Sequence, residues 1–243
     1  MAVVIPIYQS ELSESEMASL RQCVKVLGNY PIKVIKPRSL NLDDIKVQFK
    51  KIEFIGFDDA YFSDIAGYNR LMTNIDFYRS FPAYKYILIY QLDAFVFRDE
   101  LAQWCKKGFD YVGAPTLYQS EFNALPAESK DEFAKALSDK RFVLNGGLSL
   151  RRVPAMIRYL RIYNSLFFSP WKGNEDMLFS QDATRLIPLK PFLRLPSWKE
   201  ALNFAFEKSP AATFELTGKQ LPFGCHAWEK YDPEFWSSFI SVK

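Results

Sequence analysis

The chain has 243 residues, of which 49% are hydrophobic and 16% aromatic, enough to bury a full core in one large domain. Its 31 basic and 28 acidic residues leave a net charge of only +3, so we expect no nucleic-acid partner. The single histidine, His226, excludes a metal site built from several histidines.

Cysteine usage and apolar runs indicate the cellular compartment in which the protein is expected. Three distant cysteines without a CxxC pair predict neither a disulfide framework nor a zinc ribbon. The short N-terminal apolar run has no basic segment before it, unlike a signal peptide. No run of about 20 apolar residues predicts a membrane span. We therefore expect a reduced, cytoplasmic protein.

The first part of the chain alternates strand and helix patterns. Residues 2–8, 32–35 and 52–57 are short apolar runs that predict buried strands. After the first run, Ser13 and Glu16 have the spacing of a capping box, and Gly28 ends the helix that follows. A β-α-β opening predicts parallel strands and an α/β fold.

A longer helix is predicted over residues 62–80, and a very apolar strand follows at residues 86–97. Gln91 and Asp93 interrupt this strand. Because an unpaired buried carboxylate costs several kcal/mol, we expect Asp93 where the strand leaves the core. In open α/β sheets the carboxyl ends of strands are where ligands bind. The alternative is a capping or salt-bridged aspartate at a strand end.

The middle of the chain contains its most loop-like stretch. Residues 99–107 predict a helix, and residues 109–113 predict a strand. Residues 116–140 are polar, with a helix near 127–137, and are a candidate lid or acceptor-side insertion. Residues 141–144 predict a strand leading into Gly146 and Gly147. A glycine pair inside a strand pattern marks a bulge or a close approach of the backbone to another group.

The last part of the chain reads as more irregular. Residues 153–168 and 195–206 predict helices, and residues 222–228 predict a loop or short strand around His226. Glu175 and Asp176 open an apolar helical turn, where the helix dipole favours carboxylates, so capping is one interpretation. The aromatic residues Phe167, Phe168, Trp171, Tyr118 and Phe122 predict either core packing or a stacking platform for acceptor sugars.

These features, taken in order, resemble the GT-A fold of nucleotide-sugar glycosyltransferases. In that fold an Asp-x-Asp motif ends a central strand and binds a divalent metal on the donor diphosphate. An x-Glu-Asp motif begins a helix and supplies the base in inverting members, and a C-terminal histidine completes the metal site. Residues 91–97, 145–151, 174–179 and 224–228 also resemble a bacterial family of uncharacterised proteins thought to be such transferases.

The resemblance implies a single GT-A-like domain over residues 1–243, with a mostly parallel sheet flanked by helices. It implies an inverting transferase of polysaccharide biosynthesis, with a nucleotide-sugar donor and a glycan or lipid-linked acceptor, in the cytoplasm or at the inner face of the membrane. Asp176 would be the base, assisted by Glu175. Asp93 and His226 would hold Mn²⁺ or Mg²⁺. We expect donor contacts from Pro6, Tyr8, Gln91, Asp93, Asn145, Gly146 and Gly147.

The sequence departs from the metal motif, because it reads Asp93-Ala94-Phe95 and lacks the second carboxylate. Mg²⁺ keeps several waters and uses one or two protein carboxylates with substrate phosphates, so binding remains chemically workable. A non-catalytic glycan- or nucleotide-binding protein on the same scaffold stays open. A nucleotidyltransferase is a further alternative, although residues 9–13 lack the glycines and basic residues that its phosphate loop usually needs.

Overall fold

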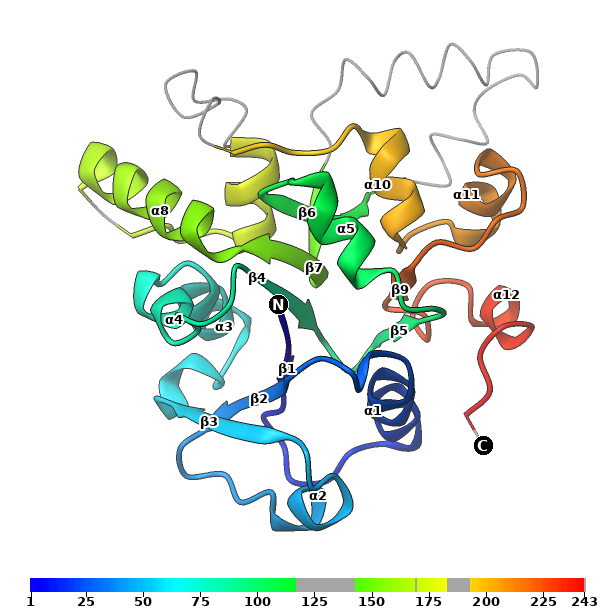
Figure 1. Cartoon of the computed structure of the whole chain (residues 1–243), viewed down its shortest axis with the longest axis horizontal. Coiled ribbons are helices and arrows are strands. Elements are labelled where there is room, and N and C mark those ends of the chain that lie inside the picture. Colours follow the sequence, from blue (N-terminus) through cyan, green and yellow to red (C-terminus); the bar gives the residue numbers. More distant parts are fainter. Residues whose placement is uncertain (117–142, 169, 183–192, 243) are drawn as a thin grey trace.

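A computed structural model describes residues 1–116, 143–168, 170–182 and 193–242. The candidate lid with its predicted helix, Tyr118, Phe122 and the start of the strand predicted at residues 141–144 lie outside the described residues. The described part has a central sheet with helices on both faces (Figure 1). This arrangement confirms the predicted α/β class with a mostly parallel sheet.

The central sheet has six strands in the order β3-β2-β1-β4-β7-β6. Its strands are β1 (Ala2–Pro6), β2 (Ile32–Pro37), β3 (Glu53–Phe57), β4 (Tyr86–Tyr90), β6 (Tyr111–Pro115) and β7 (Leu144–Arg152). The first four are parallel, and β7 runs antiparallel to both β4 and β6. A second sheet has the order β5-β9-β8, with β5 (Ala94–Val96), β9 (Gly224–His226) and β8 (Ala205–Phe206).

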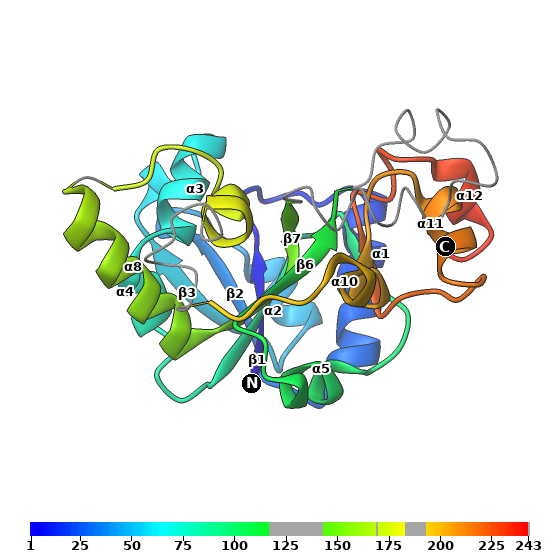
Figure 2. The ribbon, with the colours of Figure 1, turned by 90° about the horizontal axis from the view of Figure 1, so that it is seen from above.

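Alternate residues of the central strands pack into two different cores, as the strand period of two requires. Val3 and Ile5 face a core shared with α1 (Glu14–Leu27), α2 (Asp43–Gln48) and α5 (Leu101–Lys107). Val4 faces a core shared with α3 (Ile65–Met72), α4 (Ile75–Arg79) and α8 (Val153–Phe167). Figure 2 shows these two helical layers on opposite sides of the sheet.

A third core packs under the second sheet and belongs to the C-terminal part of the chain. It joins these strands to α10 (Trp198–Phe204) and to α12 (Pro233–Ser237). A further helix, α11 (Pro210–Leu216), lies between α10 and α12 in the sequence. Phe95, Phe206 and Trp236 are buried there. None of the helices that the structure describes is long and apolar enough to cross a bilayer.

Local capping confirms one predicted helix and corrects two others. Ser13 and Glu16 form the expected capping box at the start of α1. The single helix predicted over residues 62–80 is wrong, because the segment contains two helices, α3 and α4, and a 3₁₀ turn, η1 (Asp59–Tyr61), precedes it. Asn74 accepts from the backbone N–H of Asp76 and so begins a new helix. The helix predicted over residues 195–206 is shorter. The Ser197 side chain accepts from the backbone N–H of Glu200 and so begins the helix, and Ala205 ends it by pairing with Gly224 in the second sheet.

The strand predicted at residues 86–97 is two strands in two different sheets. β4 ends at Tyr90, the chain turns with Ala94 N–H donating to Gln91 O (2.9 Å), and β5 enters the second sheet. Asp93 lies in this turn, at the carboxyl end of β4. Its predicted position at the edge of the central sheet is confirmed, and the turn also places it where the two sheets meet.

Candidate active site

A cavity of about 610 Å³ opens at the carboxyl ends of β1 and β4, a size typical of small-molecule sites. Every predicted site residue except His226 lines it: Pro6, Tyr8, Gln91, Asp93, Asn145, Gly146, Gly147, Glu175 and Asp176. Its described lining also includes the carboxylates of Glu16 and Asp64 and contains no lysine or arginine. A phosphorylated ligand in this cavity would therefore meet acidic groups with no basic side chain among the described lining.

His226 lies just behind the cavity and links two of the lining residues. Its Nε2 is 3.1 Å from Asp93 Oδ1 and 3.2 Å from Gln91 Oε1. The side chain is only 7% exposed, since β9 is buried against β5. The three heteroatoms of Asp93, Gln91 and His226 therefore converge on one point of the cavity floor.

Glu207 supports His226 from the other side, and the sequence analysis did not identify it. Its Oε1 is 3.5 Å from His226 Nδ1 and accepts from Asn145 Nδ2 at 2.9 Å. Nε2 faces two oxygen acceptors, Asp93 Oδ1 and Gln91 Oε1, and Nδ1 faces Glu207, so both ring nitrogens carry protons here and a cation would replace the proton on Nε2. Carboxylates behind histidine commonly fix the ring in this way at metal sites.

The polar atoms of this cluster are incompletely satisfied. Asp93 Oδ1, His226 Nδ1 and Glu207 Oε2 are buried without a hydrogen bond, so the contact between Asp93 and His226 is a close ion pair without hydrogen-bond geometry. Burial opposes the charging of His226, but Asp93 and Glu207 outweigh it and raise its pKa to about 9. Burial likewise favours neutral Asp93, yet His226 lowers the pKa of that carboxyl. Buried unsatisfied groups are uncommon and point to a missing ligand.

The glycine pair makes room for protein side chains. A Cβ on Gly147 would lie 2.0 Å from His226 Nε2 and 2.6 Å from Gln91 Oε1. A Cβ on Gly146 would lie 2.0 Å from Glu175 Oε1. The close approach predicted from the sequence therefore exists, but the groups that approach β7 are the site's own side chains. A larger residue at either position would displace them.

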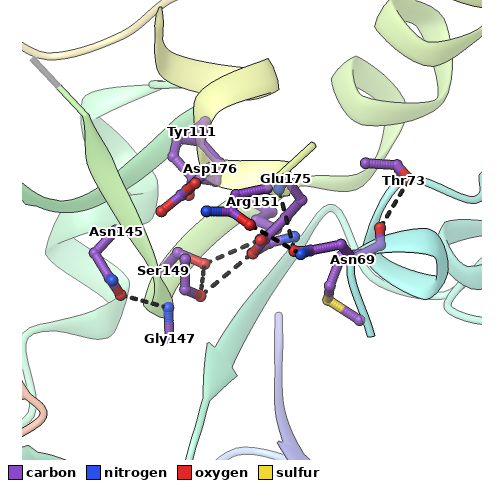
Figure 3. Close-up of polar contacts among 12 residues, drawn as sticks. Asn69, Thr73, Tyr111, Asn145, Gly147, Ser149, Arg151, Glu175 and Asp176 are labelled. Atoms are coloured by element: carbon purple, nitrogen blue, oxygen red, sulfur yellow. Dashed lines mark hydrogen bonds and ion pairs between the residues drawn. The ribbon is translucent and has the colours of Figure 1, made fainter. Parts of the chain in front are cut away.

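Glu175 is held by a fully buried arginine (Figure 3). Arg151 Nη2 is 2.8 Å from Glu175 Oε1, and the same guanidinium donates to Tyr78 Oη at 3.1 Å and to Ser149 Oγ at 3.0 Å. The backbone N–H of Glu175 donates to Asn69 Oδ1 at 3.2 Å. Because Glu175 forms this ion pair with Arg151, its carboxylate is engaged in structure and is a poor candidate for proton transfer.

Asp176 is the less constrained carboxylate of the pair. One of its oxygens accepts from Met177 N–H at 2.7 Å, and the side chain is half-buried at the cavity. Burial, then the negative charge of Glu175, raise the pKa of Asp176 to about 6, with a smaller contribution from Glu207. It precedes η3 (Met177–Asp182), a π-helix, and such helices are frequent at functional sites.

The polar side chain nearest to Asp93 in the metal motif precedes it in the sequence, whereas the motif was expected to continue after it. Phe95, which stands in the expected second position, is 7% exposed and packs in the third core near Trp228. Gln91, two residues before Asp93, reaches His226 instead. Among the described residues, no group of three histidine, cysteine or carboxylate side chains could hold a metal. The expected second carboxylate is therefore replaced by a buried phenylalanine, and an amide oxygen from two residues before Asp93 is the polar group that reaches the site.

Solved structures with a similar fold are glycosyltransferases. The galactosyltransferase LgtC, in complex with donor and acceptor sugar analogues, matches with a TM-score of 0.57 and 12% identity over 93% of this chain and 86% of that chain. Mouse xyloside xylosyltransferase 1 in its apo form matches with a TM-score of 0.52 and 10% identity over 92% and 96%. The bifunctional glycosyltransferase WbbM in its apo form matches with a TM-score of 0.53 and 13% identity over 95% of this chain and 46% of that chain.

The chain therefore has the GT-A fold found in glycosyltransferases. It belongs to the family described as "Protein of unknown function (DUF5672)", which matches residues 51–226. A search of curated proteins found no significant match. At these identities the solved structures establish the fold, and the chemistry has to be argued from the site.

Proposed function

We propose that this protein is a glycosyltransferase that moves a sugar from a nucleotide-sugar donor to a glycan or lipid-linked acceptor. The observation that carries the proposal is the placement of two different acidic groups on one cavity floor. Asp93 lies beside His226 with an unsatisfied buried oxygen, and Asp176 lies across the same cavity with a pKa of about 6. One group suits a cation on a diphosphate, and the other suits a proton acceptor.

The residues around Asp93 fit a divalent cation such as Mn²⁺ or Mg²⁺. Two ligands adjacent on an octahedral ion, each about 2.1 Å from the metal, lie about 3 Å apart. Asp93 Oδ1 and His226 Nε2 have this spacing, and Gln91 Oε1 supplies a third donor. Such a cation, when bound, would act as a Lewis acid for the leaving diphosphate. The acidic lining described above supports this role, because it offers the phosphates no basic side chain.

In this proposal Asp176 accepts the proton of the attacking hydroxyl. A base is most effective when its pKa lies near the working pH, and a carboxyl with a pKa of about 6 is mostly ionised at pH 7. Glu175 orients the turn and stays paired with Arg151. Direct attack assisted by such a base inverts the anomeric configuration, so we propose an inverting mechanism. Pro6 and Tyr8, which line the cavity after β1, are proposed donor contacts together with Asn145 and the glycine pair.

The proposal is tested first by a melting-temperature screen with UDP-, GDP-, dTDP- and CMP-sugars, each with Mn²⁺ and with EDTA. A ligand that binds the folded state raises the melting temperature by mass action. The donor that gives the largest shift is then assayed for release of its nucleotide, with Asp176→Asn as the matched control. Proton NMR of the product reports the anomeric configuration, and a retained configuration would reject inversion.

The same experiment separates the alternatives. A clear shift with no turnover by the wild-type protein would indicate a non-catalytic binding protein, an outcome that the amide in place of a carboxylate keeps open. Formation of a nucleotide sugar from a nucleoside triphosphate would indicate a nucleotidyltransferase. The acidic character of the described cavity lining argues against the latter, since a triphosphate would carry still more negative charge into it.

A further inference from the structure

The end of α8 carries large apolar side chains away from the body of the protein. Leu166, Phe167 and Phe168 are 50%, 41% and 93% exposed. Of the large hydrophobic side chains that the structure describes, Phe168 is the most exposed. Both ribbon views show this end of α8 projecting at the edge of the molecule (Figures 1 and 2). An exposed apolar group of this size marks an interaction site more often than an accident of packing.

The backbone of Phe168 adds to this picture. Phe168 ends α8 with φ of 54°, a left-handed conformation that is uncommon for a bulky residue. Tyr163 and Phe167 pack with ring centroids 4.6 Å apart, and Tyr163 also contacts the ring of Trp171 at 6.1 Å. The apolar stripe that buries α8 against the protein therefore continues past the region it covers and ends in an aromatic tip.

Charge along this segment of the sequence has a single sign. From residue 153 to residue 173 the sequence contains no aspartate or glutamate, and its charged residues are Arg158, Arg161 and Lys172. All three side chains are exposed. A basic and aromatic helix end of this composition is typical of segments that lie in a membrane interface.

We propose that the end of α8, with Leu166, Phe167, Phe168, Trp171 and Lys172, docks into the surface of an anionic lipid bilayer. The spacing suits this partner. Six residues of helix place Arg161 about 9 Å behind Phe167, and interfacial helices bury their apolar side chains about 5 to 10 Å deep. Arg161 and Lys172 would then lie at the level of the lipid phosphates. Charge complementarity favours an anionic lipid surface over a neutral one.

The docking segment is joined directly to the candidate active site. Trp171 Nε1 donates to Asn174 O at 2.9 Å, and Asn174 lines the cavity beside Glu175. Docking would therefore bring the cavity close to the bilayer. If the proposed function holds, this geometry favours the lipid-linked class of acceptor over a free soluble glycan. The docking itself does not depend on that function and is measured without turnover.

The test is flotation of the full-length protein with vesicles of phosphatidylcholine alone or mixed with phosphatidylglycerol. We expect binding to the mixed vesicles only, and its loss at 1 M salt, where the Debye length is about 3 Å. The double variant Phe167→Ser with Phe168→Ser should weaken binding at least about tenfold. Arg161→Glu should weaken it on mixed vesicles. Val47→Ser removes a side chain that is 74% exposed on α2 and should change nothing.

Several results would overturn the proposal. Equal binding to both vesicle types would show that the protein does not recognise anionic lipid. An equal loss of vesicle binding in Val47→Ser would show that the end of α8 is not the docking surface. A wild-type dimer in sedimentation that the double variant dissociates would assign the tip to contact between two copies. Normal vesicle binding by the double variant, with a raised KM for a soluble glycan acceptor, would make the aromatic side chains a sugar platform. Phe168 and Val47 are largely exposed and Phe167 is 41% exposed with its ring on Tyr163, so melting temperatures should stay within a few degrees of wild type.

Discussion

Two charged clusters lie at the floor of the same cavity, and they differ in how completely their polar atoms are satisfied. Around Glu175, the buried Arg151 makes hydrogen bonds to a carboxylate, a phenol, a hydroxyl and a carbonyl. Around His226, three buried polar atoms of Asp93, His226 and Glu207 have no hydrogen bond. The guanidinium of Arg151 is therefore satisfied within the protein, whereas the second cluster keeps buried polar atoms that a ligand could pair.

The difference separates structural from functional carboxylates. A buried charge that is fully paired holds the fold in one arrangement, while unpaired buried groups cost free energy that binding can recover. On this basis Glu175 holds the turn that carries Asp176, and Asp93 is a candidate metal ligand.

Arg151→Met should have the largest effect on stability, because it leaves Glu175 buried without a counter-charge. Losing one partner of a buried pair typically costs about 3 to 5 kcal/mol in the free energy of unfolding. The double variant Arg151→Met with Glu175→Met should recover most of this loss. Urea denaturation measures both. Arg79→Met is the control, since Arg79 and Asp76 form an ion pair of 2.7 Å in which both side chains are more than half exposed, and it should cost about 1 kcal/mol or less.

Asp176→Asn should reduce kcat by at least about 100-fold while donor affinity stays near wild type, because only proton transfer is lost. In the wild type, kcat/KM should fall as the pH drops through about 6, where the carboxylate becomes protonated. Turnover with each donor across this pH range is the measurement. Full activity in the variant would return Asp176 to a helix-capping role.

The same substitution should raise stability at neutral pH. The pKa of Asp176 is about 6 in the folded protein against 3.8 as its ordinary value, so the folded state holds the proton more tightly. Its contribution to stability therefore falls as the pH rises from about 4 to about 6. At pH 8, Asp176→Asn should be more stable than wild type by on the order of 1 to 3 kcal/mol, and the gain should disappear near pH 4. A gain that is unchanged at pH 4 would contradict this linkage.

Asp93→Asn should weaken donor binding about tenfold or more in Mn²⁺ and change it little in EDTA, because its carboxylate acts through the cation. Titration calorimetry under both conditions measures the difference. Gln91→Asp would restore a carboxylate pair two residues apart and should tighten Mn²⁺ binding. If Asp93→Asn loses the same affinity in EDTA, Asp93 contacts the sugar directly or is structural.

Glu207→Gln should have the smallest effect of the series. It keeps a group that accepts from Asn145 but removes the charge facing His226 Nδ1. Loss of such an outer partner typically weakens metal affinity by about 10- to 100-fold, and we expect the lower end because Asp93 and Gln91 remain. The melting temperature without metal should change little. A variant with unaltered Mn²⁺ affinity would show that Glu207 does not act on a metal site.

Sequence alone determined the features that depend on neighbouring residues. The capping box of Ser13 and Glu16, the buried strands and the position of Asp93 at a strand end follow from local hydrogen bonds and apolar spacing. Each of these is fixed within a few residues of chain. The α/β class could therefore be predicted, and the resemblance to glycosyltransferases identified nine of the 21 described residues that line the cavity.

Only the tertiary structure decided which partners these residues have. Arg151 meets Glu175 across 24 positions, and Glu207 meets His226 from the position after β8, pairings that no local pattern encodes. Phe95 rather than a carboxylate follows Asp93 because β5 enters the second sheet and buries Phe95 in the third core, so the polar side chain near Asp93 is Gln91. Burial forces each charge to find a partner, and the packing of distant strands determines which one is within reach.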